Sequence, residues 1–158
     1  MERVLFICTG NSCRSPMAAG IFNRLAKQRK IRDIVAESAG VFAMEGLRAS
    51  ASAITVAHRH GINLSRHRTR PYTPEIGEQA SLILTMTAEQ WYCVTESTPR
   101  EKTFLLTNFA TVDNPGIDIV DPYGGSLETY EEVFAELERE ILRAFDAIVE
   151  WVEAHPTG

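Results

Sequence analysis

The chain has 158 residues, 44% of them hydrophobic, which is enough to bury the core of one domain without a metal or disulfide bonds. Its net charge of −5 makes nucleic acid a poor partner, and no apolar stretch approaches the ~18 residues of a membrane span. The chain has three cysteines, an odd number that argues against a secreted disulfide framework, and "MERVLFICTG" does not resemble a signal peptide. We therefore expect one cytoplasmic domain over residues 1–158. The sequence does not indicate its oligomeric state.

Hydrophobic patterns divide the chain into alternating strands and helices. Short apolar runs predict buried strands, at residues 3–8, 33–40, 81–86 and 102–107. Helical spacing of apolar residues predicts helices, at residues 15–26, 49–60, 87–92 and from Ser126 onward. Ser15 and Pro16 are expected to be the N-cap and the first residue of the first helix.

This alternation predicts an α/β fold. We expect a single doubly wound sheet of four parallel strands, flavodoxin-like, with helices on both faces. Ligands of such sheets bind beyond the carboxyl ends of the strands. The segment "CTGNSCRSP" (8–16) occupies that position after the first strand.

The loop after the first strand combines a thiol with groups that bind anions. Its backbone N–H groups are expected to turn inward as an anion nest, with conformational freedom from Gly10 and a planar phosphate-binding fork from Arg14. We expect this positive field to lower the pKa of Cys8, whose thiolate could then displace the leaving group of a bound phosphoryl group. The expected phosphate-binding residues are Thr9, Gly10, Asn11, Ser12, Cys13, Arg14 and Ser15.

The reaction also needs a proton donor, and "DNPGIDIVDPYGGS" (113–126) offers three aspartates. Asp121 is the preferred candidate, because the proline after it stiffens the loop and two glycines let it fold over the pocket. Tyr123 would then form one wall of the cleft. Asp113 and Asp118 are better explained as turn residues.

With "CTGNSCRSP", "ESAG" after the second strand and "DPYGGS" before the last helix, nearly the whole chain resembles the low-molecular-weight protein-tyrosine phosphatases. The resemblance implies that Cys8 is the nucleophile, that Arg14 binds the phosphoryl group and that Asp121 is the general acid. It implies a phosphatase of phosphorylated proteins that works through a cysteinyl-phosphate, without a metal or an organic cofactor. Ser15 would hydrogen-bond the thiolate.

Further site residues follow from the same resemblance. Asn11, Ser38 and His67 resemble the polar network that holds the loop in shape, although His58 and His60 lie close to His67 in sequence. Cys13 resembles a second loop cysteine that forms a reversible disulfide with an oxidised nucleophile; the alternative is a spectator.

Ser12 bears on the substrate. Tyrosine-specific members often carry a bulky aliphatic residue there, whereas a related bacterial branch that acts on phosphoarginine carries threonine. A short polar residue leaves room near the phosphorus for a guanidinium leaving group, and Tyr123 would stack on a phenol or a guanidinium. We therefore take phosphotyrosine-type protein substrates as the main hypothesis and phosphoarginine as the alternative.

Three other classes of protein fit the motifs less well. Arsenate reductases share this fold and loop but need two further cysteines, and the chain has only Cys93 beyond the loop. A phosphate-binding module would not need a thiol, an arginine and an aspartate together. A flavin carrier would need space for the isoalloxazine ring, and a loop that binds a single phosphate with an arginine indicates no such space.

The basic run "HRHGINLSRHRTR" (58–70) stands out in an acidic chain. It is either a solvated face or a rim of the pocket that draws in anionic substrates.

Overall fold

Four short apolar runs form one parallel sheet. The computed structural model describes residues 1–112 and 114–157. Its strands lie in the order β2-β1-β3-β4, each pair parallel, which confirms the predicted fold class. Both faces of the sheet are covered, so the strands are apolar runs rather than alternating ones. The strands are β1 (Glu2–Cys8), β2 (Ile34–Gly40), β3 (Leu82–Thr85) and β4 (Thr103–Leu105).

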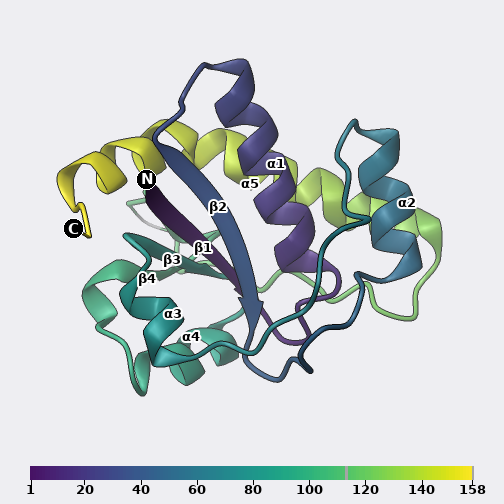
Figure 1. Ribbon diagram of the computed structural model, residues 1–158, viewed down its shortest axis with the longest axis horizontal. Coiled ribbons are helices and arrows are strands. Elements are labelled where there is room, and N and C mark those ends of the chain that lie inside the picture. Colours follow the sequence, from purple (N-terminus) through teal and green to yellow (C-terminus); the bar gives the residue numbers. More distant parts are fainter. Residues whose placement is uncertain (113, 158) are drawn as a thin grey trace.

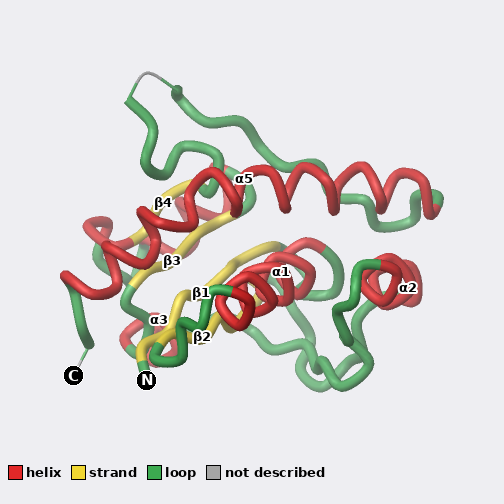
Figure 2. The backbone as a smooth tube through the Cα atoms, turned by 90° about the horizontal axis from the view of Figure 1, so that it is seen from above, coloured by secondary structure: helices red, strands yellow, loops and turns green. Residues whose placement is uncertain are grey.

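The helices lie on both faces of this sheet (Figure 1). α1 packs on β2 and on α5. α2 packs against the N-terminal part of the long α5 (Figures 1 and 2). The helical segments are α1 (Arg14–Gln28), α2 (Ala51–Arg59), α3 (Pro74–Glu78), α4 (Ala88–Thr95), the 3₁₀ turn η1 (Arg100–Lys102) and α5 (Leu127–Ala154). None of the described helices has the length and apolarity that a bilayer crossing needs.

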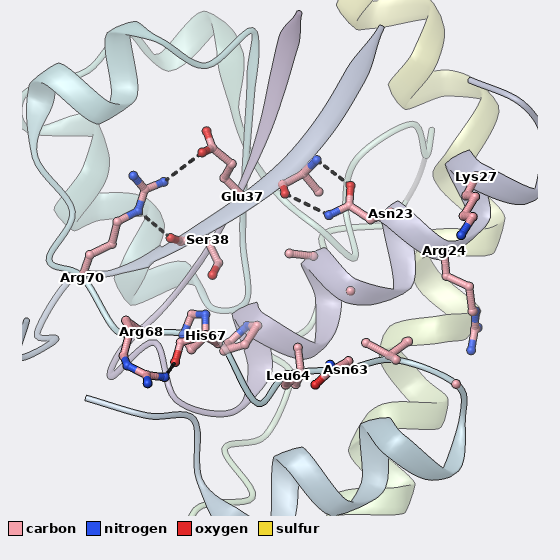
Figure 3. A pocket seen from close by; sticks show the side chains of 16 residues that line it. Asn23, Arg24, Lys27, Glu37, Ser38, Asn63, Leu64, His67, Arg68 and Arg70 are labelled. Atoms are coloured by element: carbon pink, nitrogen blue, oxygen red, sulfur yellow. Dashed lines mark hydrogen bonds and ion pairs between the residues drawn. The ribbon is translucent and has the colours of Figure 1, made fainter. Parts of the chain in front are cut away.

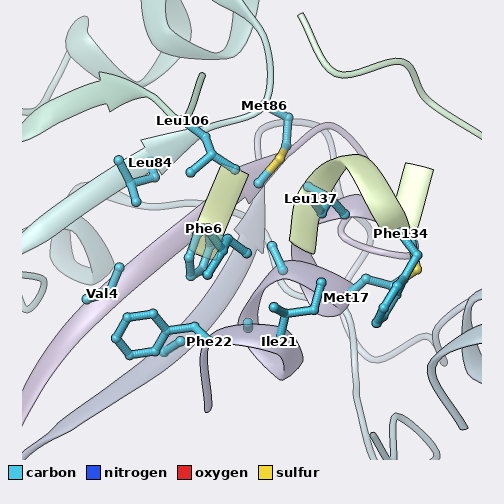
Figure 4. Packing of buried hydrophobic residues seen from close by; sticks show 14 of the residues in the cluster. Val4, Phe6, Met17, Ile21, Phe22, Leu84, Met86, Leu106, Phe134 and Leu137 are labelled. Atoms are coloured by element: carbon cyan, nitrogen blue, oxygen red, sulfur yellow. The ribbon is translucent and has the colours of Figure 1, made fainter. Parts of the chain in front are cut away.

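The central strand β1 shows why two cores form. Val4 and Phe6 point to the larger core, between the sheet and the helices α1 and α5 (Figure 4). Leu5 and Ile7 point the opposite way, to a smaller core that includes Val94 of α4. Successive side chains of a strand alternate between faces, and each large buried side chain contributes roughly 1.5–3 kcal/mol. Burial of β1 on both faces holds its carboxyl end, Cys8, in a rigid frame.

Two local predictions were wrong or incomplete. α1 begins at Arg14 with Cys13 at the N-cap, so Ser15 is not the N-cap and Pro16 is not the first helical residue. The Ser15 hydroxyl contacts Cys8 instead of capping the helix. The short helix α3 was not predicted, because five residues are too few to show a helical period.

Candidate active site

A cavity of about 440 Å³ opens at the carboxyl end of β1. Its floor is the loop that follows β1, and its walls come from the segments after β2 and before α5. It therefore lies where ligands of doubly wound sheets bind. We call it the catalytic cavity; its lining is Cys8, Thr9, Gly10, Ser12, Cys13, Arg14, Phe42, Met44, Leu47, Arg48, Ser50, Thr69, Asp121 and Tyr123.

Cys8 sits at the centre of the floor, buried but facing the catalytic cavity. Its Sγ lies 2.9 Å from Ser15 Oγ and accepts a hydrogen bond from the Asn11 backbone N–H at 3.2 Å. Asn11 Nδ2 donates to Ser15 Oγ at 2.9 Å. Because that oxygen already accepts from Asn11, the Ser15 proton is free to point at the sulfur, which suits a thiolate.

Burial raises the pKa of the Cys8 thiol above its ordinary value. The hydrogen bonds from Ser15, the charge of Arg14 and the Asn11 N–H act in the opposite direction. The predicted lowering of this pKa is therefore wrong in its net sign, because desolvation of the charged form outweighs the positive field. The three opposing groups are nonetheless the ones the sequence indicated.

Asn11 holds the loop in its bend. It is the left-handed residue of the loop, with φ 57°, whereas Gly10 does not use a positive φ; the freedom assigned to Gly10 is thus not what shapes the turn. Asn11 Nδ2 also donates to Ser38 Oγ at 2.9 Å, and its Oδ1 accepts from the Arg70 N–H at 3.0 Å. These bonds offset the strain of the left-handed backbone.

His67 completes this support, with Nε2 donating to the Asn11 carbonyl at 2.8 Å. Burial, assisted by the charges of Arg68 and Arg70, lowers the His67 pKa, so the ring is neutral near pH 7 and Nε2 carries its proton. The neighbouring His60 pairs with Glu131 on α5 instead. The structure thus brings together the three residues that the family resemblance named for the network, Asn11, Ser38 and His67.

The end of β2 forms a shelf under the loop. The Val41 N–H donates to the Cys8 carbonyl and the Phe42 N–H to the Thr9 carbonyl, both at 3.0 Å. A Cβ at Gly40 would lie 2.4 Å from the Thr9 carbonyl oxygen and 2.9 Å from Asn11 N. Only glycine permits this close approach.

Several backbone N–H groups of the loop remain available to an anion. Those of Gly10, Ser12 and Cys13 donate to no acceptor within residues 1–112 and 114–157. They stand beside the N-terminus of α1, whose dipole also favours negative charge. The loop can therefore hold a phosphoryl group against Cys8.

Arg14 and Asp121 meet on one side of the catalytic cavity. Arg14 is buried; its Nη1 donates to the Ile119 carbonyl at 2.8 Å, and its Nη2 lies 3.7 Å from Asp121 Oδ2. Asp121 is half exposed, and its Oδ1 accepts from the Tyr123 N–H at 3.0 Å. This places a fixed cation and an accessible carboxyl group side by side in the catalytic cavity.

Asp118, the other described aspartate of that loop, does not line the catalytic cavity. Asp118 Oδ1 accepts from the Ala88 N–H at 2.9 Å, so it caps the start of α4. Asp113 lies outside the described residues. Tyr123 lines the cavity with its side chain largely exposed, as expected of a wall.

Gln90 is a buried residue that supports the loop, a role that the sequence did not indicate. Its Nε2 donates to Thr9 Oγ1 at 3.1 Å, while its Oε1 accepts from the Met86 and Thr87 N–H groups. Thr87 and Gln90 form the capping box of α4. The spacing Thr-x-x-Gln of a capping box can be seen in the sequence, but the contact of Gln90 with Thr9 cannot.

Cys13 is surrounded by three hydroxyl groups, of which the sequence did not indicate those of Ser50 and Tyr130. Its Sγ lies 3.3 Å from both Ser50 Oγ and Tyr130 Oη, and 3.6 Å from Ser12 Oγ. Burial and the contact with Cys13 raise the pKa of Tyr130 to about 12, so its hydroxyl keeps its proton. Cys93 is half-buried on α4 and does not line the catalytic cavity.

The basic run does not rim this cavity with its charges. Among the described residues of 58–70, Thr69 alone lines it, through the face of the segment that meets the loop. His67, Arg68 and Arg70 line a different cavity behind the loop. The hypothesis that the basic run 58–70 rims the catalytic cavity is therefore wrong.

Comparisons with known proteins agree with this geometry. Residues 3–153 match the family model described as low molecular weight phosphotyrosine protein phosphatase. A protein-arginine-phosphatase of Geobacillus stearothermophilus is 40% identical over 138 residues, which is 86% of this chain and 88% of that protein.

Solved structures give the same picture. The low molecular weight protein tyrosine phosphatase of T. tengcongensis superposes with a TM-score of 0.86 at 40% identity, over 93% of this chain and 99% of that one. A YwlE arginine phosphatase, a cysteine-to-serine mutant with a phosphorylated active site serine, has a TM-score of 0.80 at 33% identity, over 88% and 90% of the two chains.

Proposed function

Because the chain belongs to the low molecular weight phosphotyrosine protein phosphatase family, and is thus a cysteine-dependent protein phosphatase, we propose that it hydrolyses phosphotyrosine-type protein substrates through a cysteinyl-phosphate on Cys8. The observation that carries the proposal is the convergence of Cys8, Arg14 and Asp121 on one cavity. It is supported by the short contact of Ser15 with the sulfur.

In the first step, the Cys8 thiolate attacks the phosphorus of the bound ester. An S–P bond forms as the P–O bond to the phenol breaks, and protonated Asp121 gives its proton to the leaving oxygen. Arg14 and the N–H groups of Gly10, Ser12 and Cys13 hold the phosphoryl oxygens, whose charge they balance in the transition state.

In the second step, water attacks the phosphorus of the cysteinyl-phosphate. The Asp121 carboxylate takes a proton from this water, the S–P bond breaks, and phosphate leaves the Cys8 thiolate behind. The Ser15 hydroxyl can donate to the departing thiolate and stabilise it, because the Ser15 oxygen lies 2.9 Å from the sulfur and already accepts from Asn11 Nδ2. The phosphate-binding loop and Asp121 thus serve both steps.

A second candidate substrate is protein phosphoarginine, favoured by Ser12 on the cavity lining. Its short side chain leaves space beside the phosphorus, where a bulky aliphatic residue would stand against a guanidinium. The exposed ring of Tyr123 suits stacking on a planar cation. In this case the bond that breaks is P–N, and Asp121 protonates the leaving nitrogen.

The proposal extends to the setting of the enzyme. Residues 1–158 act as one phosphatase domain, in the cytoplasm, on phosphorylated proteins rather than on nucleic acids or at a membrane. The acidic net charge and the odd number of cysteines support this assignment.

The test compares Cys8→Ser with the matched variant Cys93→Ser. With a phosphotyrosine peptide, Cys8→Ser is expected to lose turnover while calorimetry still detects phosphate binding, because the loop and Arg14 remain. Cys93→Ser is expected to keep turnover, because its thiol lies off the catalytic cavity. Normal turnover by Cys8→Ser would remove Cys8 as the nucleophile.

A further inference from the structure

A second cavity, of about 530 Å³, lies behind the phosphate-binding loop. Its walls are one side of α1, the end of β2 and the segment 61–70 (Figure 3). It shares no lining residue with the catalytic cavity. We call it the rear cavity; the residues that matter below are Arg24, Lys27, Ser38, His67, Arg68 and Arg70.

The rear cavity concentrates positive charge in a chain whose net charge is −5. Among the residues that the structure describes, four cationic side chains line it, and Glu37 is the one carboxylate of the lining. Glu37 is already engaged, by Arg3 at 2.9 Å and Arg70 at 3.9 Å. Such a surplus in a concave site attracts anions, because the field of the cations adds up inside it.

Two of the four cations have no acidic partner among the described residues. Within residues 1–112 and 114–157, no carboxylate lies within 4.0 Å of the charged groups of Lys27 or Arg68. Arg68 Nη1 donates to the His67 carbonyl at 2.8 Å, which steadies the side chain and leaves its other donors available. By contrast, Arg24 pairs with Glu138 on α5.

The two unpaired cations come from different elements. Figure 3 shows Lys27 on α1 at one end of the rear cavity and Arg68 in the segment 61–70 at the other. The lining also includes the apolar residues Ala19, Gly20, Ile62 and Leu64, and in the view of Figure 3 Leu64 lies between the two cations. A ligand that satisfies both cations therefore needs anionic groups at both of its ends, and the volume falls within the ~300–1,000 Å³ of small-molecule sites.

The rear cavity is connected to the phosphate-binding loop by direct hydrogen bonds. Ser38 and His67 line it, and the same two side chains hold Asn11 through its amide and its carbonyl oxygen, at 2.9 and 2.8 Å. Asn11 in turn contacts both Ser15 and the Cys8 sulfur. A ligand that orders or shifts Ser38 and His67 therefore acts on the position of the loop.

We propose that the rear cavity binds a small ligand carrying two or more phosphate groups, held between Lys27 and Arg68, and that its binding changes turnover at Cys8 through Ser38, His67 and Asn11. Inorganic oligophosphates and phosphorylated sugars share this chemistry. The second half of the proposal rests on the proposed function, whereas the binding itself is measured without turnover.

The test uses calorimetry with two probes, inorganic tripolyphosphate and fructose 1,6-bisphosphate. The wild-type chain is compared with the double variant Lys27→Glu/Arg68→Glu. The matched control is Arg66→Glu/Arg139→Glu, which changes the net charge equally at two exposed arginines that line neither cavity. We expect the rear-cavity variant to weaken binding about tenfold or more and the control to change it little. Tighter binding of the sugar bisphosphate than of tripolyphosphate identifies an organic ligand, and the reverse an inorganic one.

Three outcomes would overturn the site. These are no binding of either probe to wild type, equal binding by wild type and the rear-cavity variant, and equal weakening in both double variants. Steady-state kinetics then test the coupling. In the wild type, the probe should change kcat even at saturating substrate, as a ligand that does not compete with substrate would. In the rear-cavity variant, the probe should leave kcat unchanged. Binding that leaves kcat unchanged overturns the coupling. Loss of the Cys8 assignment, by contrast, leaves the binding result untouched.

Discussion

Asp121 Oδ2 lies 3.7 Å from Nη2 of Arg14, although one side chain is half exposed and the other is buried. The same guanidinium donates to the Ile119 carbonyl at 2.8 Å, so Arg14 fixes the loop that carries Asp121. A phosphoryl group gripped by Arg14 would therefore have a proton donor beside its leaving group. Asp121 has this contact with Arg14, whereas Asp118 bonds to the Ala88 N–H, so substitutions at the two aspartates should have different effects.

Asp121→Asn is expected to lower kcat by about 10²–10⁴-fold, the range of general acid catalysis, with phosphate binding retained. The loss should be larger on phenyl phosphate than on p-nitrophenyl phosphate, because the poorer leaving group depends more on the proton. Steady-state rates on the two esters measure this.

Asp118→Asn is the matched control. Its side chain caps α4 through the Ala88 N–H, so we expect near-normal kcat and slightly lower thermal stability. Full activity in Asp121→Asn, together with a collapse of kcat in Asp118→Asn, would exchange the two assignments.

Ser15→Ala is expected to shift the acidic limb of the kcat/KM profile to higher pH. Burial already raises the Cys8 pKa, and the Ser15 hydrogen bond counteracts this; removing it raises that pKa further. The reactive thiolate is the form present above this pKa, so a higher value demands a higher pH. Ultraviolet titration of the thiolate, with Cys8→Ser as the blank, reports the same shift, and an unmoved limb would show that Ser15 does not stabilise the thiolate.

Ser12→Ile is expected to lower turnover of phosphoarginine peptides relative to phosphotyrosine peptides. The longer aliphatic side chain fills cavity space beside the phosphorus that a guanidinium leaving group needs. Ser12→Thr keeps the hydroxyl and serves as the control, with a nearly unchanged ratio. The ratio of kcat/KM on matched peptides is the measurement; if isoleucine leaves it constant, Ser12 does not select the substrate.

Gly40→Ala is expected to destabilise the chain by about 1–3 kcal/mol, as overpacking does, and to lower kcat. The new Cβ meets the Thr9 carbonyl and Asn11 N, so the phosphate-binding loop must move. Gly10→Ala is the contrast, since its Cβ meets only Ser12 Oγ at 3.7 Å, and its free energy of unfolding should change by less than about 0.5 kcal/mol. Denaturant unfolding measures the free energy of unfolding of both variants. Equal values would mean that the end of β2 and the loop accommodate the Gly40 Cβ without strain.

Much of the fold was predictable because its signals are local. Apolar runs of strand length and helical spacing of apolar residues report burial directly, and the starts of α4 and α5 follow from Thr87 and Ser126, whose side chains accept from backbone N–H groups three residues on. The failure at the start of α1 has a physical reason. The local sequence favours Ser15 as a helix cap, but in the folded chain its hydroxyl contacts the Cys8 sulfur instead.

The sequence by itself determined the chemistry of the site: a thiol after a buried strand, an arginine at the start of a helix and an aspartate before the last one. Only the tertiary structure decided how these groups are tuned and supported. Whether burial or positive charge governs the Cys8 pKa depends on how much water the packed helices exclude. That Gln90 holds Thr9, that Gly40 lies under the loop and that Arg68 faces the rear cavity follow from contacts between elements distant in the chain, which no local pattern of residues encodes.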